Sequence, residues 1–272
     1  MEQRFKELVD LTVEMGEFAK ENMSKIHRSV KADGSFVTET DLAINDRMIK
    51  EIERLYPEAN VVTEENADTP FNPDAPLTFA IDPVDGTTAY SRGMPTWAVS
   101  VGIIDRFRKP VGAVVYLPCF GCRSESSLFV REIGSDTVYL NGEPYTISME
   151  GRDVIRDMIT GDRSWKHIEF PRDTFKCKMR SLCSSVVDML CQILFVDFSA
   201  SINDAGCYVW DVAGTDAILS AYGIHTALSD GTRELYTDEY TKYRKPYPLP
   251  VYAATDAALQ FMFSNFKVRI NP

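Results

Sequence analysis

Histidine is scarce in this sequence, and long apolar runs and an excess of basic charge are missing from it. It contains 3 histidines in 272 residues, and none of them adjoins a nucleophile motif, which disfavours a Ser-His-Asp hydrolase. No window approaches the ~18 apolar residues that span a membrane, and the charged N-terminus lacks a secretory signal pattern. The formal net charge of -11 would repel nucleic acid and anionic lipid. We therefore expect a cytoplasmic protein with neither a nucleic-acid polymer nor a membrane as partner.

Nucleotide-binding loops and a disulfide framework are absent as well. Neither a P-loop nor a G-x-G-x-x-G motif occurs, and residues 98–102 lack the first glycine of a nucleophile elbow. The 6 cysteines of a chain without a signal pattern are expected to be reduced thiols. Cys119 and Cys122 form a single C-x-x-C pair, which leaves a redox role open, whereas a zinc site would need a second pair.

The hydrophobic pattern predicts an α/β protein. The 44% hydrophobic and 25% charged residues are typical of a globular protein, and the length fits one large domain or two small ones. Near Gly151 a meander of strands gives way to alternating helices and strands, so we expect an N-terminal half, 1–150, and a C-terminal half, 151–272, within one compact unit. Helices are predicted at 5–26, 41–55, 185–195, 211–221 and after 255; strands are predicted at 60–63, 77–81, 97–104, 111–117, 127–131, 137–140, 225–229 and 251–255.

An acidic motif, D-P-V-D-G-T-T at residues 82–88, follows a predicted buried strand. Its first carboxylate stands at the carboxyl end of that strand, where open α/β sheets bind ligands. Asp82, Asp85 and the Val84 carbonyl oxygen can converge there on a hard cation, which prefers oxygen ligands. If the residues from Gly86 onward open a helix, their N–H groups would face an anion. The motif therefore suits a metal-assisted phosphate site.

Further acids stand where other predicted elements begin or end. Asp41 lies at the start of a predicted helix, and the pair Glu64 and Glu65 follows a short predicted strand. Asp211 stands at the N-terminus of another predicted helix, where it could cap the backbone N–H groups or ligate a metal. Two strand ends thus present carboxylates, and two helix starts add more.

These motifs together resemble the inositol monophosphatase family of Mg²⁺-dependent, lithium-sensitive phosphatases. The resemblance rests on V-T-E-T-D at 37–41, E-E-N at 64–66, D-P-V-D-G-T-T at 82–88 and W-D-V-A-G at 210–214, in matching order and spacing. It extends from about residue 2 to residue 263. It implies a layered αβαβα fold of mixed α/β class, and a homodimer is usual in the family. The N-terminal half would carry most metal ligands, and the C-terminal half would carry Asp211 and the substrate loop.

The resemblance also implies a cofactor, two to three Mg²⁺ ions, and the residues of the site. The metal positions would be Glu64, Asp82, Val84 through its carbonyl oxygen, Asp85 and Asp211. The catalytic positions, which would orient the attacking water, are Glu64, Thr87 and Asp41. The substrate would contact Gly86, Thr87, Thr88, Ser184, Ser185 and Asp204.

The implied reaction is hydrolysis of a small phosphate monoester by metal-activated water, without a phosphoenzyme. The run Thr87-Thr88-Ala89-Tyr90 is similar to the inositol monophosphatase branch, which favours myo-inositol monophosphate. Fructose-1,6-bisphosphatase, histidinol-phosphatase and 3′(2′),5′-bisphosphate nucleotidase activities stay open on the same scaffold, as does a non-catalytic metal- or ligand-binding regulator. The chain departs from the family pattern at Cys183, where a glycine is usual, and at Gly223-Ile224-His225.

Overall fold

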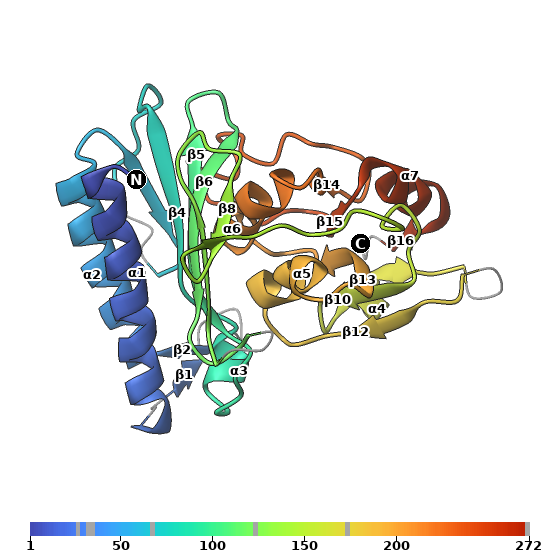
Figure 1. The fold of residues 1–272 in the computed structure, drawn as a ribbon, viewed down its shortest axis with the longest axis horizontal. Helices are drawn as coiled ribbons and strands as arrows, with labels where there is room; N and C mark the ends of the chain where they lie inside the picture. Colours follow the sequence, from blue (N-terminus) through green and yellow to red (C-terminus); the bar gives the residue numbers. More distant parts are fainter. Residues whose placement is uncertain (26–27, 31–35, 66–68, 122–124, 172–174, 270–272) are drawn as a thin grey trace.

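Alternating layers of helix and sheet build the molecule. The computed structural model describes residues 1–25, 28–30, 36–65, 69–121, 125–171 and 175–269. Figure 1 shows a helix pair, a first sheet, a second helix pair, a second sheet and an outer helix in succession. The helices of these layers are α1 (Gln3–Asn22), α2 (Glu39–Leu55), α5 (Ser185–Leu194), α6 (Val209–Ser220) and α7 (Asp256–Asn265). The layered mixed α/β fold implied by the resemblance is thereby confirmed.

The outer helix pair follows from two amphipathic patterns. Apolar side chains spaced three or four residues apart, such as Leu8 and Met15 in α1 and Met48 in α2, are buried against the first sheet. A capping box opens α2, because the backbone N–H of Thr38 donates to Asp41 Oδ2 at 3.0 Å. The Asp41 side chain is thereby held in place at the buried N-terminus of α2.

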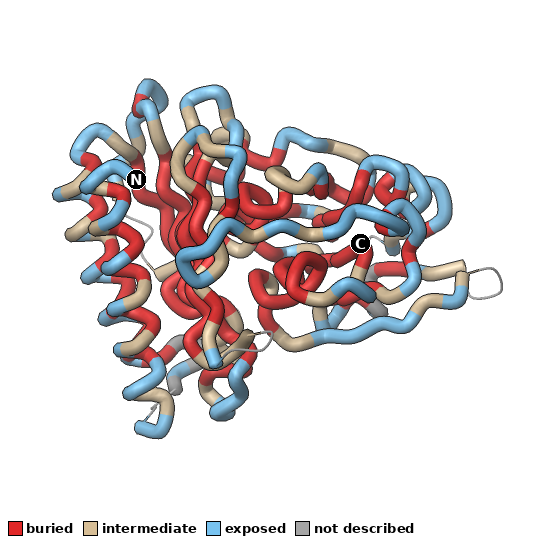
Figure 2. Tube along the Cα trace, viewed as in Figure 1, coloured by how far each residue is buried: buried red, intermediate tan, exposed pale blue. Residues whose placement is uncertain are grey.

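The first sheet has seven strands in sequence order. Its first two strands are parallel and all later neighbours are antiparallel, which confirms the predicted meander. Both faces of its central strands are buried, as Figure 2 shows. The strands are β3 (Asn60–Thr63), β4 (Leu77–Asp85), β5 (Ala98–Asp105), β6 (Pro110–Leu117), β7 (Ser127–Arg131), β8 (Val138–Leu140) and β9 (Glu143–Pro144).

Strand β4 is longer than its sequence pattern predicts. The predicted strand ends at residue 81, whereas the ladder with β5 continues to the pair Asp85–Ala98 after a register shift that begins at Asp82. A shift of this kind bends a strand and re-aims its side chains. The two carboxylates of the motif are therefore held by the sheet and do not stand in a turn beyond it. One helical turn, α3 (Thr87–Tyr90), follows Gly86, whose φ is 83°.

Helix α6 lies unusually close to the first sheet. A Cβ atom on Gly102 of β5 would lie 2.5 Å from the backbone carbon of Ala213 and the backbone nitrogen of Gly214. A Cβ atom on Gly214 would in turn lie 2.6 Å from Ser100 Oγ. Because neither glycine carries a side chain, helix and strand touch backbone to backbone. This approach sets the height of Asp211, in the first turn of α6, above the sheet.

The second sheet has five strands in the order β12-β10-β13-β15-β14. Its first three strands are parallel to one another, and α5 and α7 cover its two faces. The sequence pattern predicted β14 and β15 but not the other three. Its strands are β10 (Asp157–Thr160), β12 (Lys178–Arg180), β13 (Phe198–Asn203), β14 (His225–Leu228) and β15 (Val251–Ala254). Shorter elements are η1 (Met23–Lys25), α4 (Ser164–His167), and the two-stranded ladders of β1 (Arg28–Val30) with β2 (Phe36–Thr38) and of β11 (Ile168–Glu169) with β16 (Lys267–Val268).

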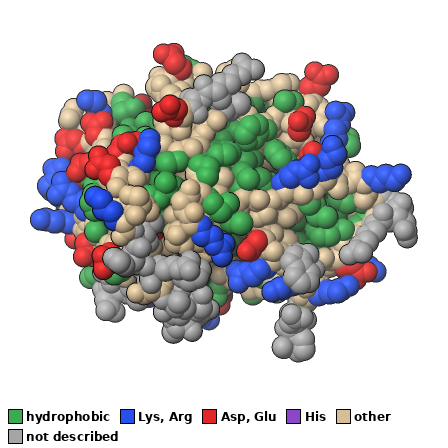
Figure 3. All heavy atoms as spheres, turned by 90° about the horizontal axis from the view of Figure 1, so that it is seen from below, with side chains coloured by type: hydrophobic (Ala, Val, Ile, Leu, Met, Phe, Trp, Pro, Cys, Tyr) green, Lys and Arg blue, Asp and Glu red, His purple; other side chains and the backbone are tan. Residues whose placement is uncertain are grey.

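The surface carries charges of both signs. On the face shown in Figure 3, Lys and Arg side chains lie among Asp and Glu, and hydrophobic side chains gather near its centre. Among the described residues, no helix is both long enough and apolar enough to cross a bilayer.

Candidate active site

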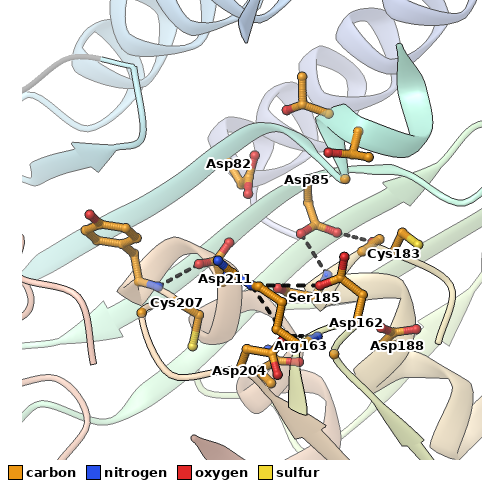
Figure 4. Close-up of a pocket in the computed structure, with 18 of the residues that line it drawn as sticks. Asp82, Asp85, Asp162, Arg163, Cys183, Ser185, Asp188, Asp204, Cys207 and Asp211 are labelled. Carbon is orange, nitrogen blue, oxygen red and sulfur yellow. Dashed lines mark hydrogen bonds and ion pairs between the residues drawn. The ribbon is translucent and has the colours of Figure 1, made fainter. Parts of the chain in front are cut away.

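Three carboxylates from two distant parts of the chain meet between the two sheets. Asp82 and Asp85 come from the bulged end of β4, and Asp211 comes from the first turn of α6. One carboxylate oxygen from each of the three lies within 4.8 Å of the other two. Figure 4 shows Asp82 and Asp85 above and Asp211 below, around one space. The sequence motifs placed all three acids at one site, and the structure brings them together.

Burial and mutual repulsion raise the pKa of each acid in this cluster. Burial raises the pKa of Asp82 well above its usual range, with Glu64 and Asp85 adding to the shift. Burial does the same to the pKa of Asp211, helped by Asp85. The pKa of Asp85 rises to about 6, because burial outweighs the hydrogen bonds that favour its charged form. Crowded acids of this kind need a proton or a cation to neutralise them.

The Asp85 carboxylate also binds the N-terminus of α5. It accepts the backbone N–H of Ser185 at 3.1 Å and that of Val186 at 3.0 Å, and the Ser184 hydroxyl donates to it as well. Helix N-termini carry unpaired N–H groups and a partial positive charge. Ser184 and Ser185, predicted to contact the substrate, are therefore engaged by Asp85 while they line the same cavity.

The two other predicted catalytic side chains, Asp41 and Thr87, meet beside this cluster. Thr87 Oγ1 lies 3.2 Å from Asp41 Oδ1 and 3.0 Å from the Val84 carbonyl oxygen. The hydroxyl of Thr87 can donate its one proton to only one of these two acceptors at a time. The lone pairs of Thr87 Oγ1 stay available to accept a hydrogen bond from another donor. Asp41 is almost wholly buried, and its burial raises its pKa.

A cavity of about 640 Å³, the size of a small-molecule site, is lined by the three clustered acids and by Thr87. Asp41 lies behind Thr87 and is not one of the lining residues. Glu64 lines the cavity directly after β3, and repulsion from Glu64 contributes to the raised pKa values of Asp41, Asp82 and Asp211. The remaining predicted residues that line it are Val84, Gly86, Thr87, Thr88, Ser184, Ser185 and Asp204.

Asp204 is tied to the loop that follows β10. Its Oδ2 accepts the backbone N–H of Arg163 at 2.9 Å, and its Oδ1 accepts the Ser164 hydroxyl at 2.6 Å. Gly161 permits this approach, since a Cβ atom there would lie 2.4 Å from Asp204 Oδ2. The predicted contact of Asp204 with substrate hydroxyls would have to use the remaining lone pairs of these oxygens.

The sequence analysis missed Asp162, Arg163 and Asp188, which also line the cavity. The first two follow the short strand β10 after Gly161, and this strand has too few residues to show a period. Had that strand been recognised, the rule that ligands bind at the carboxyl ends of strands would have indicated them. Asp188 lies in the first turn of α5, accepts the N–H of Leu182 at 2.8 Å, and has a pKa that burial raises well above its usual range.

The donors at this site fit a hard divalent cation. Mg²⁺ prefers oxygen ligands. The site offers the carboxylate oxygens of Asp82, Asp85, Asp211 and Glu64 and the carbonyl oxygen of Val84. Sulfur from Cys183 or Cys207 also lines the cavity, but thiols suit softer metals. Cys122 lies outside the described residues, so the C-x-x-C hypothesis stays a prediction.

Comparison with known proteins points to one family. The sequence model of the inositol monophosphatase family matches residues 1–254. An inositol monophosphatase of Dictyostelium discoideum is 26% identical over 241 residues, covering 82% of this chain and 84% of its own. The fold matches that of a staphylococcal inositol monophosphatase-1, solved as a LiCl-soaked inhibitory complex, with a TM-score of 0.78 and 15% identity over 97% of both chains.

A second solved structure has the same fold. A dual-specific inositol monophosphatase and NADP phosphatase bound with D-inositol-1-phosphate superposes with a TM-score of 0.75 and 15% identity, covering 96% of this chain and 94% of its own. The match of the family's sequence model spans nearly the whole chain, and the acids that carry the family motifs meet in one cavity. This chain belongs to the inositol monophosphatase family and is a phosphoric monoester hydrolase.

Proposed function

We propose that this enzyme hydrolyses a small polyol monophosphate, with myo-inositol monophosphate as the first candidate substrate. The observation that carries the proposal is the approach of Asp82, Asp85 and Asp211 to within 4.8 Å beside a small-molecule cavity. When bound there, Mg²⁺ supplies an acidified water nucleophile and neutralises charge on the phosphate and the leaving oxygen. Two to three ions in the site, a homodimer and a cytoplasmic location are further parts of the proposal.

The residues around the cluster would position the reactants. Thr87 can donate its proton to Asp41 and accept a hydrogen bond from the attacking water, which would fix the direction of attack. Glu64 would hold a cation and orient the same water. The Asp85 carboxylate is itself oriented by the N-terminus of α5, so it cannot swing away from its neighbours. Water is the nucleophile in this scheme, and no phosphoenzyme forms.

Polar groups on the cavity wall favour a polyol as the alcohol. Asp204, Asp188 and the hydroxyl of Ser184 can bond sugar or cyclitol hydroxyls, while no aromatic ring other than that of Tyr208 lines the cavity among the described residues. Sugar bisphosphates, histidinol phosphate and phosphonucleotides remain alternative substrates for the same chemistry. An enzyme that had lost its activity would be expected to lose at least one acid of the cluster, because unpaired clustered acids destabilise a fold that no longer binds metal. All of them are present, which favours the phosphatase over a non-catalytic regulator.

The direct test is phosphate release from a panel of phosphomonoesters with Mg²⁺, with Mg²⁺ plus Li⁺, and with EDTA. We expect Mg²⁺-dependent release that Li⁺ inhibits, fastest on inositol monophosphates. In Asp85→Asn, turnover should fall by roughly a hundredfold or more, because a charged ligand and helix cap is replaced by a neutral amide of the same shape.

Two results would overturn parts of this proposal. Preference for another ester would keep the mechanism and change the substrate. No release from any ester, together with a Mg²⁺-induced rise in melting temperature, would support the regulator instead. Near-normal turnover in Asp85→Asn would remove this residue from the metal site.

A further inference from the structure

Two short segments that lie far apart in the chain have nearly the same sequence. They are R-F-R-K-P at residues 106–110 and K-Y-R-K-P at residues 242–246, so each has a basic residue, an aromatic residue, an arginine and a lysine before a proline. The first segment connects β5 with β6, and the second lies in the long connection between β14 and β15. We call residues 106–109 and 242–245 the twin turns. In a chain whose net charge is -11, they are two local clusters of positive charge.

The same backbone conformation occurs in both turns. Arg108 has a φ of 63° and Arg244 a φ of 50°, in the left-handed region that residues with a side chain rarely adopt. Both arginine side chains bind other parts of the chain. Arg108 donates to Thr241 Oγ1 at 3.1 Å and pairs with Asp238, and Arg244 donates to the hydroxyl of Thr69. Because Thr241 directly precedes the second turn, the Arg108 contact holds the two turns next to each other.

The aromatic side chains of the twin turns are exposed. Phe107 is 67% exposed and Tyr243 is 63% exposed. The residue before each ring places a cation over it: Arg106 Cζ lies 4.7 Å from the centre of the Phe107 ring, and Lys242 Nζ lies 5.3 Å from that of Tyr243. Each turn therefore presents an apolar ring together with positive charge to a partner outside the molecule.

We propose that the twin turns bind the surface of an anionic lipid bilayer, peripherally and reversibly. Aromatic rings favour the interface between water and the acyl chains, whereas the cations of Lys and Arg stay at the level of the lipid headgroups. Each turn offers this combination in adjacent residues. The contact of Arg108 with Thr241 lets both turns reach one flat surface, and two linked weak contacts bind more tightly than either alone.

The net charge of the chain does not exclude this contact. The expectation that no membrane is a partner rested on the sum of charges over the whole sequence. At physiological ionic strength, salt screens exposed charges beyond a Debye length of about 8 Å, so lipid beside the turns interacts chiefly with nearby groups. The acids of this region are already engaged. Asp105 accepts two backbone N–H groups of the first turn, Asp238 pairs with Arg108, and Glu239 pairs with Lys245 at 3.0 Å.

A single-stranded nucleic acid is the main alternative partner, because its bases could stack on the two rings and its phosphates could bind the cations. We favour the bilayer because rings at exposed turns can enter a flat surface without a groove. A nucleic-acid strand would have to continue beyond the turns, over a molecule whose net negative charge repels its phosphates.

Co-sedimentation with vesicles tests the proposal. The whole chain is mixed with vesicles of phosphatidylcholine alone and with vesicles that also contain phosphatidylserine, each at low and at high NaCl concentration. We expect binding to the vesicles with phosphatidylserine, weaker binding at high salt, and little binding to phosphatidylcholine alone. In the double variant Phe107→Ser, Tyr243→Ser, the apparent dissociation constant should rise by about tenfold or more, because no ring can enter the interface.

Two further double variants separate the roles of ring, charge and folding. Val154→Ser with Val196→Ser removes two apolar side chains that are 61% and 81% exposed elsewhere on the molecule, and this control should bind like the wild type. Lys109→Gln with Lys242→Gln keeps both rings and should lose the preference for phosphatidylserine. An unchanged melting temperature in each variant shows that the chain is folded.

Several outcomes would decide against the proposal. The wild-type protein could fail to bind vesicles with phosphatidylserine, the ring variant could bind them equally well, or the valine control could lose as much binding. Binding of a fluorescein-labelled oligodeoxythymidylate that the ring variant loses, without any vesicle binding, would assign the twin turns to single-stranded nucleic acid instead. Phosphate release is measured independently of all these results, so none of them bears on the proposed function.

Discussion

At the scale of single residues, the wall of the active-site cavity includes a cysteine whose backbone conformation is unfavourable for any residue with a side chain. Cys183 has a φ of 63°, in the left-handed region that glycine adopts without strain. The family pattern has a glycine at this position, and the structure gives the physical reason for it. The strained residue directly precedes Ser184, whose hydroxyl donates to Asp85. This departure from the family pattern therefore lies one residue from a contact of the proposed metal site.

We predict that Cys183→Gly is more stable than Cys183→Ala by about 1 kcal/mol. Alanine keeps the left-handed strain of about 1 kcal/mol or more, whereas glycine removes it and loses part of the gain through the greater freedom of the unfolded chain. Urea unfolding of both variants measures the difference. Equal midpoints with equal slopes would show that the φ angle is not strained.

At the scale of elements, local patterns predicted those parts of the structure that local patterns determine. Long helices and the antiparallel meander have enough residues to show a period, and the acids at their ends were correctly brought together. The short parallel strands β10 and β12 have 4 and 3 residues and pair with distant segments, so no period marks them. Arg163 and Asp162, which follow β10, were missed for the same reason.

The close approach of α6 to β5 yields a prediction about the metal site. In Gly102→Ala the new Cβ atom would overlap the backbone of Ala213 and Gly214, so α6 must move away from the sheet and carry Asp211 with it. We expect a loss of about 1–3 kcal/mol in stability, as for other overpacked cores, together with a several-fold higher Mg²⁺ concentration for half-maximal activity. Chemical unfolding and a Mg²⁺ titration of turnover measure the two effects.

A matched control exists on the opposite face of the same sheet. Gly16 lies in α1, a helix that contributes no predicted site residue. In Gly16→Ala the new Cβ atom would lie 2.4 Å from Tyr116 Cδ1. This variant should lose stability without changing its Mg²⁺ requirement. If both variants raised the Mg²⁺ requirement equally, the effect would report general destabilisation and not the height of α6.

At the scale of the whole molecule, we propose that residues 1–150 and 151–272 act as halves of one unit joined at the acid cluster. Asp82 and Asp85 belong to the first sheet, and Asp211 belongs to the helix layer between the sheets. The N-terminus of α5 also binds Asp85 across this boundary. The cluster therefore connects segments that are remote in the sequence.

Proton and Mg²⁺ should compete to stabilise this junction. The pKa of Asp85 is raised from 3.8 to about 6, so between about pH 4 and 6 the folded protein binds more protons than the unfolded chain does. Without metal, this carboxyl therefore contributes stability that is present at low pH and is lost as the pH rises through its folded pKa. We predict that Mg²⁺ raises the melting temperature more at pH 7 than at pH 5.

Thermal unfolding at both pH values, with Mg²⁺ and with EDTA, measures this difference. In Asp85→Asn, which cannot titrate, the dependence of the Mg²⁺ effect on pH should shrink. An equal rise at both pH values in the wild-type protein would mean that the cluster is already ionised at pH 5.

The meeting of β4 and α6 at one cation site also has a consequence for how the chain folds and unfolds. The ligands from β4 and from α6 come together only when the distant halves of the chain have docked, so early, locally structured states hold an incomplete set. Mg²⁺ can then do little to accelerate folding. The stabilisation by Mg²⁺ should instead appear as a slower unfolding rate, so the bound cation should increase the kinetic stability of the folded molecule.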